Sequence, residues 1–129
     1  MATTDVTPVQ TSNLLGSLHD FQKTFNENQR VKKLTKGWNR FLKAEATDTS
    51  EIFTVTIQDL AINEIQPGCS LPEDDEDLIT LQAAEEVLVR IFTGKYNPAH
   101  ALIDGALAVF CSERDKVKLE AIAMVIWGL

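Results

Sequence analysis

The stretch DLITLQAAEEVLVRIFTGKYNPAHALIDGALAVFCSERDKVKL, residues 77–119, decides how this chain folds. After a short strand-like start, AAEEVLVRIFTG places its apolar residues in one broad helical stripe. Gly94 can close that helix in the left-handed conformation, Asn97 can cap the next helix, and Pro98 suits its first position. Gly105 then ends this short helix, and ALAVFC reads as a compact apolar strand. Ser112 with Asp115 predicts the cap of a last helix.

The pair Gly94-Lys95 also raises the question of a phosphate-binding loop. Such a loop needs a glycine five residues before Gly94 and a hydroxyl side chain directly after the lysine. Those positions hold Val89 and Tyr96. We therefore interpret the glycines of this stretch as helix ends rather than as a nucleotide site.

The residues before this stretch add one helix and further strands. Leu14, Leu18, Phe21 and Phe25 have the spacing of an amphipathic helix. A weaker pattern through Val31, Leu34 and Trp38 suggests that this helix restarts or continues, and from Trp38 onward the period changes to that of a strand. EIFTVTIQ, residues 51–58, alternates apolar and polar side chains as a half-buried antiparallel strand does, and LAINEI, residues 60–65, continues it. The sequence predicts an α+β fold, with a mostly antiparallel, five-stranded-type sheet covered by helices on one face.

Length and composition favour a single domain spanning residues 1–129, of which we expect 1–11 to be flexible. The longest uncharged apolar run is too short to cross a bilayer, and the first ten residues lack the pattern of a secretory signal. We therefore expect a cytoplasmic protein. Cys69 and Cys111 are too few and too far apart to predict a disulfide framework.

The net charge of −7 is unevenly distributed along the chain. Residues 73–77 form an unbroken acidic run, which lacks the spacing and the glycine of a calcium loop and reads as a solvated loop. Acidic residues also dominate the second half, so we expect no nucleic-acid partner. A basic block lies between residues 30 and 43. It is either a solvated surface or a transient contact with an anionic membrane, through Arg30, Lys32, Lys33, Lys36 and Arg40.

No catalytic constellation is visible in the sequence. His19 and His100 have no Cys, Asp or Glu at metal-ligand spacing, and the serines lack a nucleophile elbow. We therefore expect no catalytic residue, no metal ion and no cofactor.

The stretch that decides the fold resembles the C-terminal half of the sterol carrier protein type 2 family, the sterol-binding and non-specific lipid-transfer domain. FTVTIQDLAINEIQPG is similar to the family's central hairpin, and the resemblance covers residues 51–120. It departs where the family has a Gly-Asp turn and this chain has CSERD. The positions that match the family's pattern are Gly94, Lys95, Asn97, Pro98, Gly105, Leu107 and Val109.

In that family the same elements enclose an apolar tunnel for sterols, fatty acyl chains or acyl-CoA esters. The resemblance thus implies binding and carriage of a hydrophobic ligand. The last helix begins charged and ends in AIAMVIWGL, which needs apolar cover on more than one side, so we expect residues 117–127 to form one wall. The expected cavity residues are Phe53, Val55, Ile57, Leu88, Ile91, Phe92, Leu102, Ile103, Ile122, Met124, Val125, Ile126 and Trp127.

Two other classes of function stay open from the sequence. One is a small enzyme that uses the same cavity, which a polar pair with perturbed pKa values inside the cavity would reveal. The other is a protein-interaction module or accessory subunit of a lipid or polyketide biosynthetic enzyme, with a well-packed core and an exposed C-terminal patch. We expect a monomer or a weak homodimer.

Overall fold

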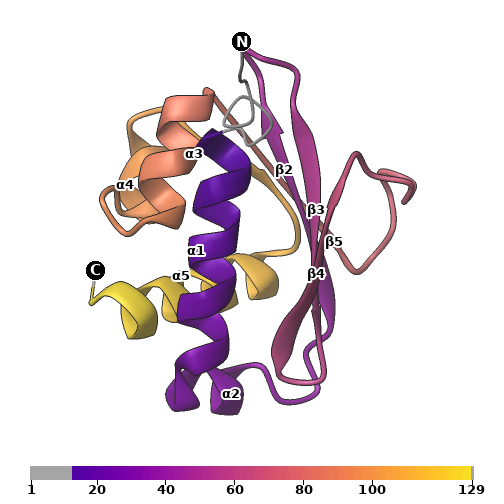
Figure 1. Cartoon of the computed structure of the whole chain (residues 1–129), viewed down its shortest axis with the longest axis vertical. Helices are drawn as coiled ribbons and strands as arrows, with labels where there is room; N and C mark the ends of the chain where they lie inside the picture. The colour runs from indigo at the N-terminus through magenta and orange to yellow at the C-terminus, as the bar shows by residue number, and fades with distance from the viewer. Residues whose placement is uncertain (1–12, 129) are drawn as a thin grey trace, which may run out of the picture.

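The computed structural model of the chain describes residues 13–128. The expected flexibility of residues 1–11 lies outside the described residues. One layer is a five-stranded sheet and the other is formed by helices, which all lie against the same face of the sheet (Figure 1). The predicted α+β class, with helices on one face, is confirmed. The elements in chain order are α1 (Asn13–Glu27), α2 (Gln29–Leu34), β2 (Arg40–Ala46), β3 (Ile52–Gln58), β4 (Ala61–Pro67), β5 (Leu78–Ala83), α3 (Glu85–Phe92), α4 (Pro98–Ile103), β6 (Ala108–Phe110) and α5 (Glu113–Trp127).

The sheet has the strand order β4-β3-β2-β5-β6. Three of its neighbouring pairs are antiparallel, but β2 and β5 run parallel, with Phe41 opposite Leu78. The sheet is therefore mostly antiparallel, as predicted, but it includes one parallel pair. Two hairpin reversals leave β4 running in the same direction as β2, and residues 68–77 return the chain to the end where β2 begins. As a result β5 starts beside the start of β2 and follows it in the same direction.

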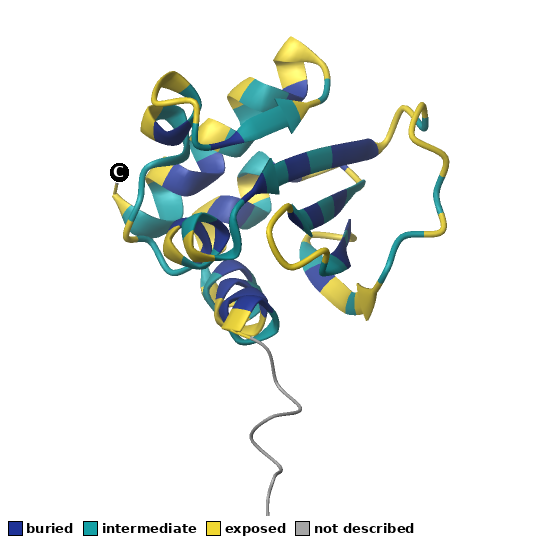
Figure 2. Cartoon of the chain, turned by 90° about the horizontal axis from the view of Figure 1, so that it is seen from above, coloured by how far each residue is buried: buried dark blue, intermediate teal, exposed yellow. Residues whose placement is uncertain are grey.

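Alternating side chains place the core between the sheet and the helices. Leu42, Ala44 and Ala46 of β2 are buried, and the residues between them are only partly covered. From the helical side, α1 contributes Leu14, Leu18, Phe21 and Phe25 at the spacing that predicted this helix. Figure 2 shows the buried residues along the sides of the helices and strands that face each other. The amphipathic patterns of the sequence thus meet in one core.

Side-chain caps set the ends of three helices. The Asn28 carboxamide accepts hydrogen bonds from the backbone N–H groups of Arg30 and Val31, so α2 begins as a helix separate from α1. Asn97 caps α4 through the N–H of Ala99 at 2.8 Å, and Ser112 caps α5 through the N–H of Asp115 at 3.1 Å. The last two caps confirm the predicted helix starts, because each satisfies an N–H that has no partner within its helix.

Candidate ligand cavity

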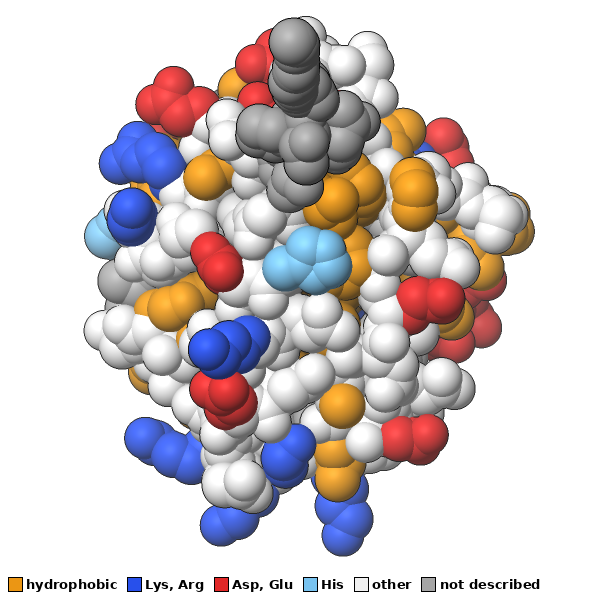
Figure 3. All heavy atoms as spheres, in the orientation of Figure 1, with side chains coloured by type: hydrophobic (Ala, Val, Ile, Leu, Met, Phe, Trp, Pro, Cys, Tyr) orange, Lys and Arg blue, Asp and Glu red, His pale blue; other side chains and the backbone are white. Residues whose placement is uncertain are grey.

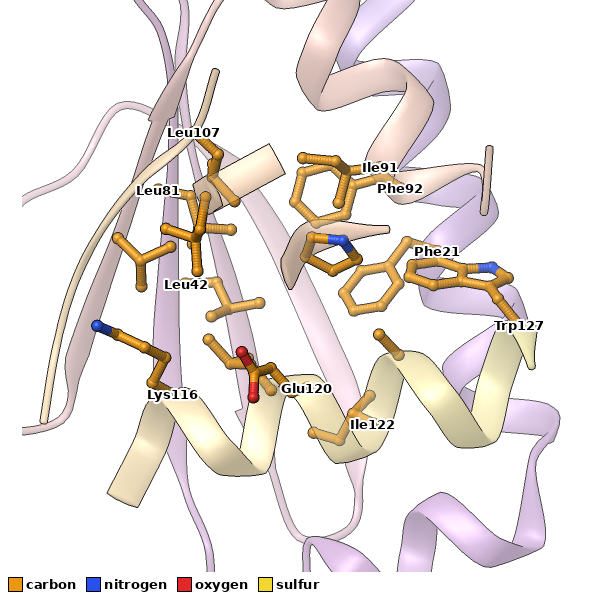
Figure 4. A pocket seen from close by; sticks show the side chains of 15 residues that line it. Phe21, Leu42, Leu81, Ile91, Phe92, Leu107, Lys116, Glu120, Ile122 and Trp127 are labelled. Carbon is orange, nitrogen blue, oxygen red and sulfur yellow. The ribbon is translucent and has the colours of Figure 1, made fainter. Parts of the chain in front are cut away.

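An apolar cavity lies between the sheet and helix α5 (Figure 4). The sheet, α1, α3 and α4 supply its other walls, and α5 runs along the side that Figure 4 shows at the bottom. Of the fifteen side chains that line it, only two are polar, and both belong to α5. The lining consists of Phe21, Leu42, Leu81, Ile91, Phe92, Pro98, Leu102, Leu107, Val109, Lys116, Leu119, Glu120, Ile122, Ala123 and Trp127.

The free space in this cavity is about 60 Å³. An engineered apolar cavity of roughly 150 Å³ stays dry and binds benzene, so the present space is smaller than a single aromatic ring requires. Apolar walls of this kind give a water molecule too few hydrogen-bond partners to hold it. The cavity is thus suited to apolar groups, and a ligand of lipid size requires its walls to move apart.

Buried hydrogen bonds hold the N-terminal half of α5. The Asp115 side chain is only 4% exposed; its Oδ1 accepts a hydrogen bond from Trp38 Nε1 at 2.8 Å and its Oδ2 accepts one from Arg40 Nε at 2.9 Å. Asp115 belongs to the charged start of this helix, yet its side chain is buried. The helix start lies against the start of β2, where the indole and the guanidinium compensate the buried carboxylate.

The pKa of Asp115 reflects this environment. Burial alone pushes the pKa up, but the hydrogen bonds from Arg40 and Trp38 and the positive charge of Arg40 outweigh burial and hold the pKa below its ordinary value. Asp115 is therefore a carboxylate at neutral pH. Its hydrogen bonds fix the helix start, and Asp115 does not line the cavity.

Apolar packing holds the C-terminal end of α5. The ring of Trp127 lies 5.7 Å from the ring of Phe21, centre to centre, and it covers the backbone of Gly94. A Cβ built on Gly94 would stand 2.5 Å from Trp127 Cδ1, so only glycine leaves room for the indole here. Gly94 also has a φ of +79°, which other residues rarely adopt. Gly94 thus ends α3 and also provides the surface on which Trp127 packs.

The structure brings five of the sequence-predicted cavity residues together: Ile91, Phe92, Leu102, Ile122 and Trp127. The other predicted residues lie elsewhere in the fold. Those that are buried in the core outside the cavity lining are Phe53, Val55, Ile57 and Leu88. Those that are half-buried outside the lining are Val125 and Ile126.

Two predicted residues lie on the surface instead. Ile103 is 82% exposed and Met124 is 61% exposed, so neither faces the cavity. The apolar end of α5 accordingly has one covered side and one open side. Val117, 62% exposed, lies seven residues before Met124 and continues the open side along the helix.

The remaining lining residues were not expected to border a cavity. Phe21 and Leu42 belong to predicted apolar stripes, but a stripe does not tell which of its members border free space. Lys116 and Glu120 carried no signal at all, because charged residues on a helix usually face solvent. Only the direction in which α5 crosses the sheet brings both to the cavity.

Titratable groups with shifted pKa values lie outside the cavity. Burial is the main cause that raises the pKa of Glu85, and a hydrogen bond to Glu51 adds to it. The hydrogen bond to Asp104 raises the pKa of Tyr96. Burial raises the pKa of the Cys111 thiol. None of these three lines the cavity. Within residues 13–128 no group of three or more His, Cys, Asp or Glu side chains is arranged to hold a metal ion. Over the same range no helix is long and apolar enough to cross a membrane.

The basic block divides into two environments. Arg30, Lys33 and Lys36 are exposed and Lys32 is partly exposed, on and after α2, where Figure 3 shows Lys and Arg side chains at the lower end of the molecule. Arg40 instead bonds Asp115 and lies 3.4 Å from Asp77, so it belongs to the anchor of α5 rather than to the exposed cluster.

Comparison with known proteins finds neither a matching family model nor a matching curated protein. Solved structures are similar in fold. The solution structure of the sterol carrier protein domain 2 of Helicoverpa armigera has a TM-score of 0.64 at 13% identity, over 91% of this chain and 90% of that one. A ubiquinone synthesis protein, UbiJ-SCP2, has a TM-score of 0.62 at 14% identity, over 90% and 89%. The chain therefore has a fold like that of sterol carrier protein 2.

A larger enzyme contains a similar fold. The stereoselective inverting sec-alkylsulfatase Pisa1 from Pseudomonas sp. matches with a TM-score of 0.56 at 16% identity. The match covers 74% of this chain but only 14% of the alkylsulfatase.

Proposed function

We propose that this chain, whose fold is like that of sterol carrier protein 2, binds and carries a hydrophobic ligand in the cavity beside α5. The ligand class is a sterol, a fatty acyl chain, an acyl-CoA or a related lipid. The observation that supports the proposal best is the nearly complete absence of polar groups from a cavity that is lined by seven helices and strands. Each methylene that enters it leaves water and gains roughly 0.8 kcal/mol.

Ligand entry requires a wall of the cavity to move, because about 60 Å³ cannot hold an alkyl chain. The C-terminal half of α5 is the wall best suited to move. Its inner side packs on the cavity through Ile122 and Trp127, while Met124 on its outer side is open. The N-terminal half stays fixed by the Asp115 hydrogen bonds. We infer that the helix end opens and closes while its start remains in place.

A fluorescent fatty acid tests this binding. Ile122→Asp, at a residue that is 3% exposed and borders the cavity, should abolish binding because an unpaired carboxylate is costly there. Leu102→Asp places the same charge on a half-buried wall residue of α4, where the fold is less at risk. Lys118→Ala is the control, since Lys118 lies outside the lining. Unchanged affinity in a folded Leu102→Asp variant would exclude this cavity as the binding site.

The exposed basic cluster of Arg30, Lys32, Lys33 and Lys36 is the proposed contact with an anionic membrane, from which such a ligand is collected. Four basic side chains on an otherwise acidic chain give the charge complementarity, at about 1 kcal/mol for each residue near the surface. Flotation with phosphatidylserine-containing vesicles should recover the protein at low salt, and replacement of all four by Ser should prevent it. Equal recovery with neutral vesicles would contradict this contact.

A role as an accessory subunit is the second candidate, and the open side of α5 favours it. Val117 and Met124 are apolar and exposed on one side of a helix, which is typical of a protein contact. The likeness to a ubiquinone synthesis protein and to part of an alkylsulfatase is consistent with it. Association that persists after delipidation and is lost in Val117→Ser/Met124→Ser would support this role over carriage. No titratable pair with shifted pKa values lines the cavity within the described residues, so an enzymatic role lacks comparable support.

A further inference from the structure

The two tryptophans of the chain are held in different ways. Trp38 is 8% exposed, and its indole N–H donates a hydrogen bond to Asp115 Oδ1 at 2.8 Å. Trp127 is half-buried and lines the cavity, and its indole N–H makes no hydrogen bond with any residue from 13 to 128. The Trp127 ring can therefore move without breaking a directional bond to any of these residues.

Trp127 covers one edge of the cavity, where α5 meets two other helices. Its ring centre lies 5.7 Å from that of Phe21 on α1, and Figure 4 shows the two rings side by side at this edge. Its Cδ1 lies over Gly94, directly after α3, at 2.5 Å from the position of the Cβ that glycine lacks. The indole thus fills the gap between α1 and the ends of α3 and α5.

The part of α5 that carries this ring is the last turn of the helix. The helix ends at Gly128, with a φ of +72°, and the last carbonyl groups of a helix have no partner within it. Helix ends therefore open at lower cost than inner turns do. On the outer side of this turn Met124 is 61% exposed, so an outward movement breaks few contacts there.

We propose that the Trp127 indole is the gate of the cavity, and that the ligand enters and leaves between Trp127, Phe21 and Gly94. This inference rests on the proposed function, since it assigns an entry path to the same cavity. Trp127 borders the free space directly, so displacing its ring opens the cavity to the outside at this edge. The rims of this path are apolar or bare backbone, which suits the apolar part of a lipid.

A gate and a wall differ in their effect on binding kinetics. A wall residue contacts only the bound ligand, so its removal acts mainly on the dissociation rate. A gate is closed in the free protein as well, and a required conformational change slows association. An increase in the association rate on removal of a side chain therefore identifies a gate.

Stopped-flow mixing of the delipidated protein with cis-parinaric acid, a fatty acid whose fluorescence rises in apolar surroundings, tests this role. The amplitude reports binding and the rate reports the gate. Trp127→Ala should raise the association rate constant by about three- to tenfold, which corresponds to the loss of one aromatic ring pair. Leu102→Ala, at a half-buried lining residue of α4, is the control and should speed dissociation only.

A second pair of variants tests the gate with the indole still present. In Gly94→Ala the added Cβ displaces the Trp127 ring, so association should also become faster. Gly105→Ala repeats the positive φ with open space around its Cβ, and its association rate should match that of wild type.

Two results would overturn the gate while binding itself stands. One is an association rate that neither Trp127→Ala nor Gly94→Ala changes in folded protein. The other is faster association in Leu102→Ala alone, which would place the entry path at α4. A folded wild-type protein that gives no fluorescence amplitude would instead overturn the proposed function, and this inference with it.

Discussion

The two halves of helix α5 are held in opposite ways. The first half is fixed by directional bonds, with the buried carboxylate of Asp115 between Trp38 and Arg40. The second half is held by apolar packing, with Ile122 against the cavity and Trp127 over Gly94. Directional bonds lose most of their strength when a helix shifts by an ångström or two, whereas apolar contacts slide and reform. The first half of α5 can therefore stay in place while the second half moves as a wall of the cavity.

The largest expected effect comes from breaking the fixed half. Asp115→Ala leaves Arg40 Nε and Trp38 Nε1 without their partner, and we expect a loss of about 3 kcal/mol in the free energy of unfolding. Chemical denaturation measures it. Asp77→Ala is the control because Asp77 is 56% exposed and reaches Arg40 only at 3.4 Å, so it should cost under about 1 kcal/mol. Similar losses for both variants would contradict the claim that the buried hydrogen bonds of Asp115 fix the start of α5.

Truncating the movable half should cost less. Ile122→Ala removes buried methyl groups next to existing free space, and we expect a loss of about 2 kcal/mol in unfolding free energy together with a larger cavity. Met124→Ala, two residues on, is the matched control at 61% exposure and should change stability by under about 0.5 kcal/mol. Equal costs would show that α5 is rotated from the orientation described here.

The contact between Gly94 and the Trp127 indole can be tested in the same way. Gly94→Ala adds a Cβ where the indole lies and forces a positive φ on alanine, so we expect a loss of about 1–2 kcal/mol. The displaced indole should become more exposed, and its fluorescence emission should shift to longer wavelength. Gly105→Ala has a similar φ of +76° but open space around the added Cβ, so it should show only the backbone part of the stability loss and no spectral shift. An emission shift in both variants would show that the shift does not come from loss of the contact between Trp127 and Gly94.

Acid should weaken the bonds that fix the first half of α5. The folded pKa of Asp115 lies below its ordinary value of 3.8, so its contribution is complete above that value and is lost as the pH falls toward the lowered one. The stability difference between wild type and Asp115→Asn should therefore narrow as the pH falls below about 4, as thermal unfolding at several pH values would show. A difference that stays constant into acid would mean that Asp115 does not titrate in the folded protein.

The sequence was informative where structure is local. Asn97 and Ser112 predicted the starts of α4 and α5, since a cap needs only the next few residues. The anchor was not predictable in this way, because Asp115 bonds Trp38 and Arg40 across 77 and 75 residues of chain. The orientation of α5 was hidden for another reason. Its C-terminal half is apolar on every side, so periodicity could not separate Ile122, which faces the cavity, from Met124, which faces outward.

Native mass spectrometry of the delipidated protein, incubated in turn with a sterol, a fatty acid, an acyl-CoA and a long-chain alcohol, tests the central claim most directly. We predict a one-to-one complex with at least one of the four. It also predicts that folded Leu102→Asp protein forms none, because the charge lies on the cavity wall. A folded wild-type protein that binds none of the four, or a complex that survives Leu102→Asp unchanged, would contradict a ligand cavity beside α5.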